Sequence, residues 1–289
     1  MKIKDFKLEF INQIAPFFDE TEAESFFYII LEYVHDLKRI DLALQPDLQF
    51  SESEFNRWQE IIAELKTQKP IQYILGETYF YGLRFEVNQN TLIPRPETEE
   101  LVELILKSVP KESSIKILDI GTGSGCIAIS LAKNLKNASV FALDVSENAL
   151  EIASKNAKDN QVDVTFLHQS ILETSNLNQQ FDIIVSNPPY VRNLEKVEIK
   201  KNVLNFEPHL ALFVDDFDAL LFYRKIAELA KINLSENGKL YFEINQYLGK
   251  ETVELLQKMD FKNIQLFQDI YGNDRMVLAY PPNYFQIQG

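Results

Sequence analysis

Apolar residues recur at two different spacings along this chain of 289 residues. As far as about Lys69 they recur at helical spacing, which predicts amphipathic helices. One such stripe consists of Phe26, Phe27, Ile30, Leu31 and Val34. From Lys116 onward, short apolar runs alternate with segments of helical spacing. This alternation favours a mostly parallel sheet that is covered by helices on both faces.

The elements of this second part can be placed from the pattern. We predict strands near residues 116–120, 139–144, 162–167, 181–186, 239–244, 263–268 and 275–280. Helices are predicted near residues 124–136, 147–159, 216–233 and 248–258. Only residues 269–274 separate the last two strands, which is too few for a crossover helix, so these strands should be antiparallel neighbours. The prediction is an α/β fold with a seven-stranded sheet whose last strand is antiparallel.

The chain divides into three parts. Residues 1–69 contain no glycine and are predicted to form a small domain of four or five helices. Residues 70–92 begin with a helix-breaking proline and contain a predicted β-hairpin closed by Gly82, so this part should join two domains. Residues 93–289 form the α/β domain, and we expect the tail from Pro281 to be poorly ordered.

Composition excludes some classes of protein. The net charge of −14 opposes a large nucleic-acid surface, since phosphate contacts need clustered Lys and Arg. A basic protein partner fits this charge better, although solubility alone also explains it. Three His and one Cys leave little for a metal site, and neither a membrane-spanning run nor a signal peptide is seen. We therefore expect a cytoplasmic protein with no metal, no membrane partner and no direct nucleic-acid binding.

A glycine loop follows the first strand of the α/β domain. Residues 117–128 read Ile-Leu-Asp-Ile-Gly-Thr-Gly-Ser-Gly-Cys-Ile-Ala. Glycines let a ligand approach the backbone amides, and the start of a helix favours an anionic group. The acidic residue that ends the next strand can accept both hydroxyls of a ribose. The predicted cofactor residues here are Gly121, Thr122, Gly123, Ser124, Gly125 and Asp144. The alternative is a structural βαβ unit with an incidental acid.

Another predicted strand, 181–186, ends at the tetrapeptide Asn187-Pro188-Pro189-Tyr190. Proline has no N–H and restricts the residue before it, so the end of this strand should be stiff. Open α/β sheets bind ligands at such ends. The Asn187 amide and the Pro188 carbonyl would be fixed hydrogen-bond partners, and the Tyr190 ring would be an apolar wall. The alternative is a strand followed by a proline-rich turn.

Residues 91–100, Thr-Leu-Ile-Pro-Arg-Pro-Glu-Thr-Glu-Glu, precede the first strand of the sheet. Pro96 suits the first turn of a helix. Two interpretations stay open. The stretch is either a helix start whose acids are favoured by the helix dipole, or it places Arg95 beside the site as the partner of an anionic ligand group.

The glycine loop and Asp144 resemble the S-adenosylmethionine site of class I methyltransferases. With Asn187-Pro188-Pro189-Tyr190 added, the chain resembles the PrmC/HemK family, the protein-(glutamine-N5) methyltransferases that modify the Gly-Gly-Gln loop of class 1 peptide chain release factors. Further segments in family order are 70–76, 80–85, 93–99, 207–212 and 269–275. The resemblance implies a seven-stranded Rossmann-like methyltransferase sheet with the last strand antiparallel, plus a small N-terminal helical domain joined by a β-hairpin.

The resemblance also implies the cofactor S-adenosyl-L-methionine, with S-adenosyl-L-homocysteine as product, and the role of each site residue. The implied catalytic residues are Asn187, Pro188 and Tyr190, and the substrate contacts are Asn187, Pro188, Pro189 and Tyr190. The cofactor set gains Arg95, Asn187, Ser170 and Ile171. The family usually has an Asp where this chain has Ser170. Because serine is shorter and neutral, adenine recognition would lean on the Ile171 amide and on apolar packing. Residues 1–69 would dock the substrate protein.

Three other functions remain as alternatives. A methyltransferase of the same fold could act on a ribosomal-protein glutamine or on a nucleobase amine, since Asn-Pro-Pro-Tyr alone is shared with amino-methyltransferases of adenine and guanine. A nicotinamide-dependent oxidoreductase would need wider glycine spacing and a hydride-transfer residue pair. A noncatalytic module could keep the cofactor site, although the intact tetrapeptide argues against this.

Overall fold

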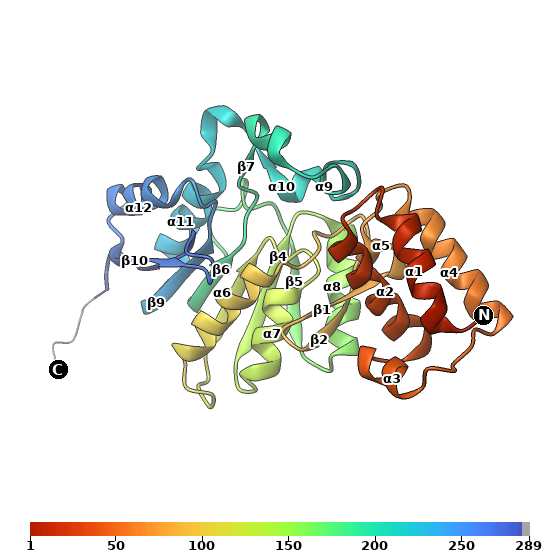
Figure 1. Cartoon of the computed structure of the whole chain (residues 1–289). Helices are drawn as coiled ribbons and strands as arrows, with labels where there is room; N and C mark the ends of the chain where they lie inside the picture. The colour runs from red at the N-terminus through yellow and green to blue at the C-terminus, as the bar shows by residue number, and fades with distance from the viewer. Residues whose placement is uncertain (285–289) are drawn as a thin grey trace. The chain divides into compact units, whose positions relative to one another are not determined.

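The structure is a computed structural model that describes residues 1–284. The tail that we expected to be poorly ordered begins at Pro281, so its last residues lie outside the described residues. The chain forms two compact units, which are described separately (Figure 1). The helical unit contains residues 1–76 and 200–206. The α/β unit contains residues 77–199 and those from 207 onward.

The helical unit is built around aromatic side chains. Its helices are α1 (Ile3–Ile14), α2 (Glu20–His35), α3 (Arg39–Leu44), α4 (Glu52–Leu65), α5 (Ile71–Leu75) and α9 (Lys201–Phe206). Phe6 and Phe10 pack edge-on against Trp58, with ring centroids 5.8 and 5.5 Å apart. Ile71 and Ile74 are buried in the same core. Helix α5 therefore belongs to the helical unit, which extends beyond the expected end at Lys69.

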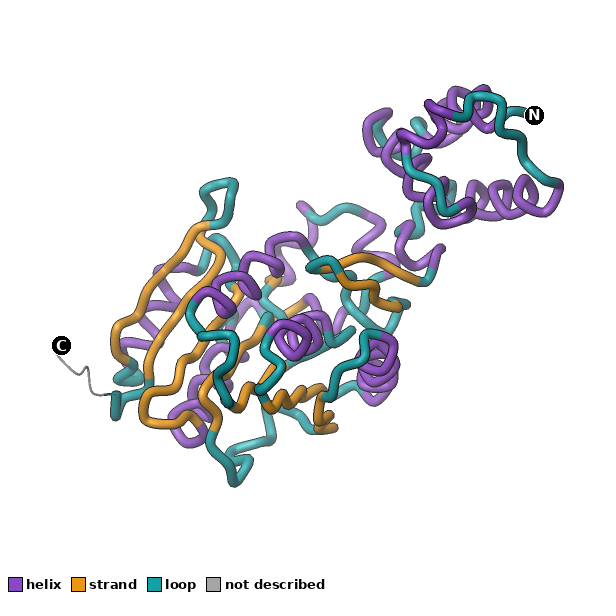
Figure 2. Tube along the Cα trace, turned by 90° about the horizontal axis from the view of Figure 1, so that it is seen from below, coloured by secondary structure: helices purple, strands orange, loops and turns teal. Residues whose placement is uncertain are grey.

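The α/β unit contains the predicted seven-stranded sheet (Figure 2). Its strands are β3 (Lys116–Ile120), β4 (Ser139–Asp144), β5 (Val164–His168), β6 (Phe181–Ser186), β9 (Leu234–Glu243), β10 (Lys262–Gln268) and β11 (Asp274–Tyr280). They follow the order β10-β11-β9-β6-β3-β4-β5. Strand β11 is antiparallel to both of its neighbours, and the other pairs are parallel. The predicted sheet with an antiparallel last strand is confirmed.

Helices cover both faces of this sheet because its strands are apolar on both sides. Helices α6 (Pro96–Lys107), α7 (Cys126–Asn134) and α8 (Glu147–Asp159) contribute to one core, and α11 (Leu221–Asn233) and α12 (Gly249–Lys258) contribute to the other. Successive strand residues point to opposite faces, so Ile183 lies in the first core and Ile184 in the second. No helix among residues 1–284 is long and apolar enough to span a bilayer.

The remaining elements connect or extend the sheet. They are β1 (Glu77–Phe80), β2 (Leu83–Glu86), β7 (Val191–Arg192), η1 (Asn193–Glu198), α10 (His209–Leu212), β8 (Phe213–Val214) and η2 (Asp216–Asp218). Strands β1 and β2 form the predicted hairpin, whose Phe80 and Phe85 are buried in the first core of the α/β unit. The helix predicted from residue 216 begins later, at Leu221, because Asp215 accepts the Phe217 N–H and closes the short turn η2 first.

Candidate active site

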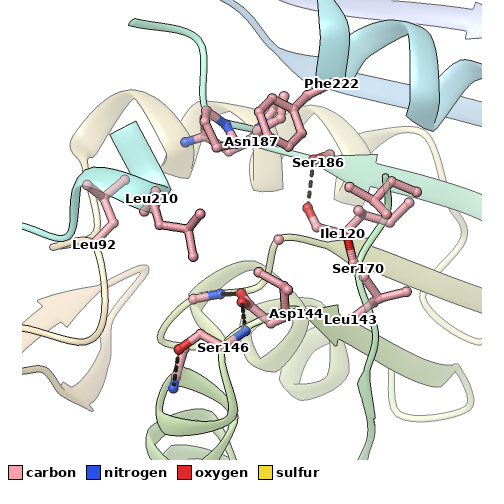
Figure 3. A pocket seen from close by; sticks show the side chains of 18 of the residues that line it. Leu92, Ile120, Leu143, Asp144, Ser146, Ser170, Ser186, Asn187, Leu210 and Phe222 are labelled. Carbon is pink, nitrogen blue, oxygen red and sulfur yellow. Dashed lines mark hydrogen bonds between the residues drawn. The ribbon is translucent and has the colours of Figure 1, made fainter. Parts of the chain in front are cut away.

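A cavity of about 370 Å³ lies where the carboxyl ends of β3, β4 and β6 meet (Figure 3). These three strands are neighbours in the sheet, so the residues that follow them lie close together. Figure 3 shows Asn187 and Phe222 on one side of the cavity and Asp144 and Ser146 on the other. The predicted site residues that line it are Gly121, Gly123, Asp144, Ser170, Ile171, Asn187, Pro188 and Pro189.

The three glycines of the loop have different surroundings. Gly121 and Gly123 have φ angles of +75° and +55°, and a Cβ atom on either would meet nothing within 4 Å. Both glycines line the cavity, so a ligand can lie close to the loop backbone there. A Cβ on Gly125 would lie 2.8 Å from Ile129 Cδ1 and 3.1 Å from Ala153 Cβ. Gly125 therefore allows close packing of the loop on α7 and α8 and does not line the cavity.

Thr122 and Ser124 are buried and are not part of the cavity lining. The Thr122 hydroxyl donates to Asp119 Oδ2 at 2.6 Å. Burial raises the pKa of Asp119 to about 7, and the nearby Asp144 adds to this increase. Thr122 thus supports the loop from inside the protein through its hydroxyl, and Ser124 does so through its carbonyl, which accepts from Asn156 Nδ2 at 2.9 Å.

Asp144 holds the loop with both carboxylate oxygens. Oδ2 accepts the Gly123 N–H at 2.8 Å, and Oδ1 accepts the Ser146 N–H at 2.9 Å. Burial raises the pKa of Asp144, and the two N–H donors act in the opposite direction. Each oxygen of an ionised carboxylate keeps further acceptor capacity for a ligand hydroxyl. The donor set therefore fits a ribose.

The side of the cavity around the end of β5 is mostly apolar. Leu143, Ala149, Ile171, Phe222 and Ile226 contribute to the lining, together with the polar Ser170. Apolar walls with a few polar groups are typical of sites for small cofactors. This chemistry fits a flat aromatic base, so the residues present fit S-adenosylmethionine. No group of three or more His, Cys, Asp or Glu side chains that could hold a metal ion occurs among residues 1–284.

Asn187 directly follows β6, and two hydrogen bonds hold this end of the strand. The Ser186 hydroxyl donates to the Ile120 carbonyl of β3 at 2.6 Å and so ties the two strand ends together. Asn187 Nδ2 donates to Thr98 Oγ1 at 3.2 Å. Pro188 and Pro189 extend the wall of the cavity beside Asn187. The stiff strand end predicted from the sequence is thus adjacent to the glycine loop.

Besides Thr122, Ser124 and Gly125, two further predicted site residues, Tyr190 and Arg95, do not line the cavity. The Tyr190 hydroxyl donates to Glu243 Oε1 at 3.3 Å, and burial raises the Tyr190 pKa well above its usual range. Arg95 Nη2 lies 2.5 Å from Glu207 Oε1, so a buried carboxylate is the partner of its charge. A direct contact of either residue with a ligand stays a prediction.

Several lining residues were absent from the predicted site. They include Gln89, Asn90, Leu92, Pro208, Leu210, Phe222 and Ile226. Leu92 precedes the Ile93–Glu99 stretch, and Pro208 and Leu210 belong to the segment 207–212. Both segments resemble segments of the family, and this resemblance could have indicated that Leu92, Pro208 and Leu210 lie near the site. Phe222 and Ile226 lie on α11, and nothing in their helical spacing separates cavity lining from core.

Comparison with known proteins agrees with this geometry. A family model described as "Methyltransferase small domain" matches residues 97–207, and one described as "PrmC N-terminal domain" matches residues 10–76. The release factor glutamine methyltransferase of Flavobacterium psychrophilum is 68% identical over 280 residues, 96% of this chain and 98% of the relative. That of Bacteroides thetaiotaomicron is 47% identical and covers 83% of this chain and 86% of the relative. The crystal structure of a methyltransferase from Pyrococcus furiosus is 20% identical, covers 80% of this chain and 99% of that chain, and has a TM-score of 0.51, which shows a shared fold.

The sheet with its antiparallel β11, the glycine loop after β3 and the acid that ends β4 define a Rossmann-like methyltransferase. The chain is thus an enzyme of the methyltransferase class. Within that class, it belongs to the family of release factor glutamine methyltransferases, the PrmC/HemK family. The resemblance inferred from the sequence is confirmed.

Proposed function

We propose that this chain transfers the methyl group of S-adenosyl-L-methionine to the side-chain amide nitrogen (N5) of the glutamine in the Gly-Gly-Gln motif of class 1 peptide chain release factors. The observation that carries the proposal is that Asn187 and Pro188 line the same cavity as Gly121, Gly123 and Asp144. A methyl donor and an amide acceptor could meet there. The names of the curated relatives support the choice of acceptor.

The cofactor would be held from two sides. Gly121 and Gly123 would let the cofactor lie close against the loop backbone because neither has a side chain, and Asp144 would accept the ribose hydroxyls. Ser170 and Ile171 would contact the adenine from the end of β5. When bound, the cofactor supplies a methyl group on a positively charged sulfur.

The protein would mainly orient the acceptor and exclude water. An amide nitrogen is a poor nucleophile because its lone pair is delocalised into the carbonyl, so alignment matters. Asn187 Oδ1 and the Pro188 carbonyl would each accept one N–H of the substrate glutamine. These acceptors would aim the nitrogen and favour the positive charge that builds on it. The contact of the Tyr190 ring with the carboxamide stays a prediction.

The role of the helical unit is a further part of the proposal. Residues 1–69 would dock the release factor, and residues 93–289 would form the catalytic domain, with residues 70–92 between them. The family model for residues 10–76 supports a distinct N-terminal domain. We place the reaction in the cytoplasm.

Labelled methyl transfer tests the acceptor. The purified protein is incubated with methyl-labelled S-adenosylmethionine and, in separate reactions, a release factor, a ribosomal protein fraction or duplex DNA. We expect label on one glutamine of the release factor, located by mass spectrometry. Label on DNA or on a ribosomal protein, with none on the release factor, would overturn the proposal.

Asn187→Ala tests the role of the strand end. Removal of the amide should lower kcat by about 10²- to 10³-fold, because a fixed partner of the reacting group is lost. Binding of S-adenosylhomocysteine, measured by calorimetry, should persist. Asn137→Ala, which changes an exposed asparagine outside the cavity lining, is the control. A near wild-type rate for Asn187→Ala would contradict the assignment.

A further inference from the structure

The hydroxyl of Thr98 connects Asn187 to a buried carboxylate. Thr98 lies in the first turn of α6 and Glu243 ends β9, and both side chains are buried. Thr98 Oγ1 donates to Glu243 Oε2 at 2.6 Å and accepts from Asn187 Nδ2 at 3.2 Å. The other oxygen of Glu243 accepts from the Tyr190 hydroxyl at 3.3 Å. One carboxylate thus holds the first residue of the tetrapeptide through Thr98 and the last residue directly.

The order of donors decides which way the Asn187 amide faces. A threonine hydroxyl has one hydrogen, and an ionised carboxylate has none. When Thr98 gives its hydrogen to Glu243, its oxygen can only accept, so Asn187 must present its NH₂ group to Thr98. The other arm of the amide is the carbonyl oxygen Oδ1, which this contact with Thr98 does not use. Because Asn187 lines the cavity, Oδ1 is available to an N–H of a ligand.

The protonation state of Glu243 controls this direction. The groups that face its carboxyl are Arg275 on β11, Glu97 on α6, Tyr190, Tyr223 on α11 and Cys126 on α7. Burial raises the pKa of Glu243, whereas the Thr98 hydroxyl and the charge of Arg275 favour the ionised form. A protonated carboxyl could donate to Thr98 and would release the Thr98 hydrogen toward Asn187. The Asn187 amide would then face the reverse way.

We propose that Thr98 and Glu243 are positioning residues for methyl transfer, and that the Glu243 carboxylate orients Asn187 through Thr98 so that Oδ1 faces the substrate amide. This inference rests on the proposed function for the identity of the acceptor. It also gives the Ile93–Glu99 stretch a role that differs from the one predicted for Arg95.

Thr98→Val keeps the shape of the side chain and removes its hydroxyl. We expect kcat to fall about 10- to 100-fold, because the Asn187 amide is no longer held in one orientation. The KM for the release factor should change little, since remote contacts with the protein substrate determine it. Thr98→Ser should restore the rate. The matched control is Thr252→Val, because Thr252 is also buried and its hydroxyl donates at 2.8 Å to the carbonyl of Leu248, the residue before α12.

The role of Glu243 is tested by the pH dependence of the methylation rate and by a double variant with Thr98. The wild-type rate should decline as the pH falls through the raised pKa of Glu243, because protonation permits the reversed amide. Glu243→Gln should lack this decline and should have a lower rate at every pH above it. The double variant Thr98→Val, Glu243→Gln should be no slower than the slower single variant, since both residues act through one chain of hydrogen bonds.

The orientation of Asn187 can also be measured without a substrate. In protein labelled with ¹⁵N at its asparagine side chains, the Asn187 NH₂ signal is assigned by its loss in Asn187→Ala. We expect this signal to shift in Thr98→Val and to stay in place in Thr98→Ser and Thr252→Val. If the wild type methylated no release factor, the proposed function would be wrong. The Asn187 NH₂ signal would still test whether Thr98 orients Asn187, because this measurement needs no substrate. A Thr98→Val protein with unchanged NH₂ signal and unchanged kcat would overturn the inference, as would a Thr98→Ser protein as slow as Thr98→Val.

Discussion

The two carboxylate oxygens of Asp144 hold the protein backbone, and we propose that they also bind the cofactor. Each oxygen accepts one backbone N–H, from Gly123 or from Ser146, so the glycine loop and the start of α8 are held by one carboxylate. The same oxygens would accept the ribose hydroxyls. A change at this residue should therefore affect cofactor binding more than the reaction that follows it.

We expect Asp144→Ala to weaken S-adenosylhomocysteine binding by about 10²-fold, which corresponds to the loss of about two hydrogen bonds to a charged group. Titration calorimetry measures this directly. Asp163→Ala, which removes an exposed carboxylate elsewhere in the α/β unit, should bind as the wild type does. Equal affinity in Asp144→Ala and Asp163→Ala would exclude the proposed ribose contact.

At the scale of elements, α2 and α4 are joined by a buried histidine. His35, in the last turn of α2, accepts from Trp58 Nε1 with its Nε2 at 3.0 Å, and its Nδ1 lies 3.2 Å from Glu54 Oε1. Trp58 and Glu54 are one turn apart on α4. Because Nε2 accepts, the hydrogen of the neutral ring is on Nδ1, which donates to Glu54. A second proton on Nε2 would face the indole N–H.

This arrangement predicts a pH dependence for the helical unit. Burial lowers the pKa of His35 below its usual 6.5, although the carboxylate of Glu54 acts in the opposite direction. A lowered folded-state pKa means that the stabilisation is present above the unfolded pKa and is lost as the pH falls below it. The urea midpoint reported by Trp58 fluorescence should therefore decrease between pH 8 and pH 5. The decrease should be smaller in His35→Gln, which cannot titrate, and equal decreases would contradict this account.

At the scale of the whole molecule, the chain has separate cores. The core of the helical unit contains only residues between Ile3 and Leu75, and the two cores of the α/β unit lie on either face of its sheet. The single tryptophan, Trp58, is fully buried in the helical unit, whereas the candidate cofactor site belongs to the α/β unit. Ligand binding and tryptophan fluorescence thus report on different units.

S-adenosylhomocysteine at about 100 times its Kd should stabilise the α/β unit by about 2.7 kcal/mol. Hydrogen exchange of peptides from β3 to β6 should slow accordingly. The urea midpoint reported by Trp58 fluorescence should be the same with and without the ligand. An equal shift of both signals would show that the two units unfold together.

The local elements of the sheet could be predicted from the sequence. The predicted limits of β4, β6 and α8 agree with the structure, because an apolar run or stripe ends there at a proline, a cap or a polar loop. The same local signals indicated the glycine loop and Asn187. Since parallel strands that share a sheet bring their carboxyl ends together, the meeting of these residues also followed from the pattern.

Contacts between distant segments could not be predicted in this way. Glu243 reaches Thr98 across 145 positions of the chain, and Arg95 is paired with Glu207 across 112. Helix α9 belongs to the helical unit although it lies in the sequence between β6 and β9 of the sheet. The sequence by itself determined the strands of the sheet and the glycine loop, because these depend on local spacing, and its motifs indicated the family by resemblance. Only the tertiary structure decided which buried carboxylate each polar side chain contacts, because packing of remote segments selects those partners.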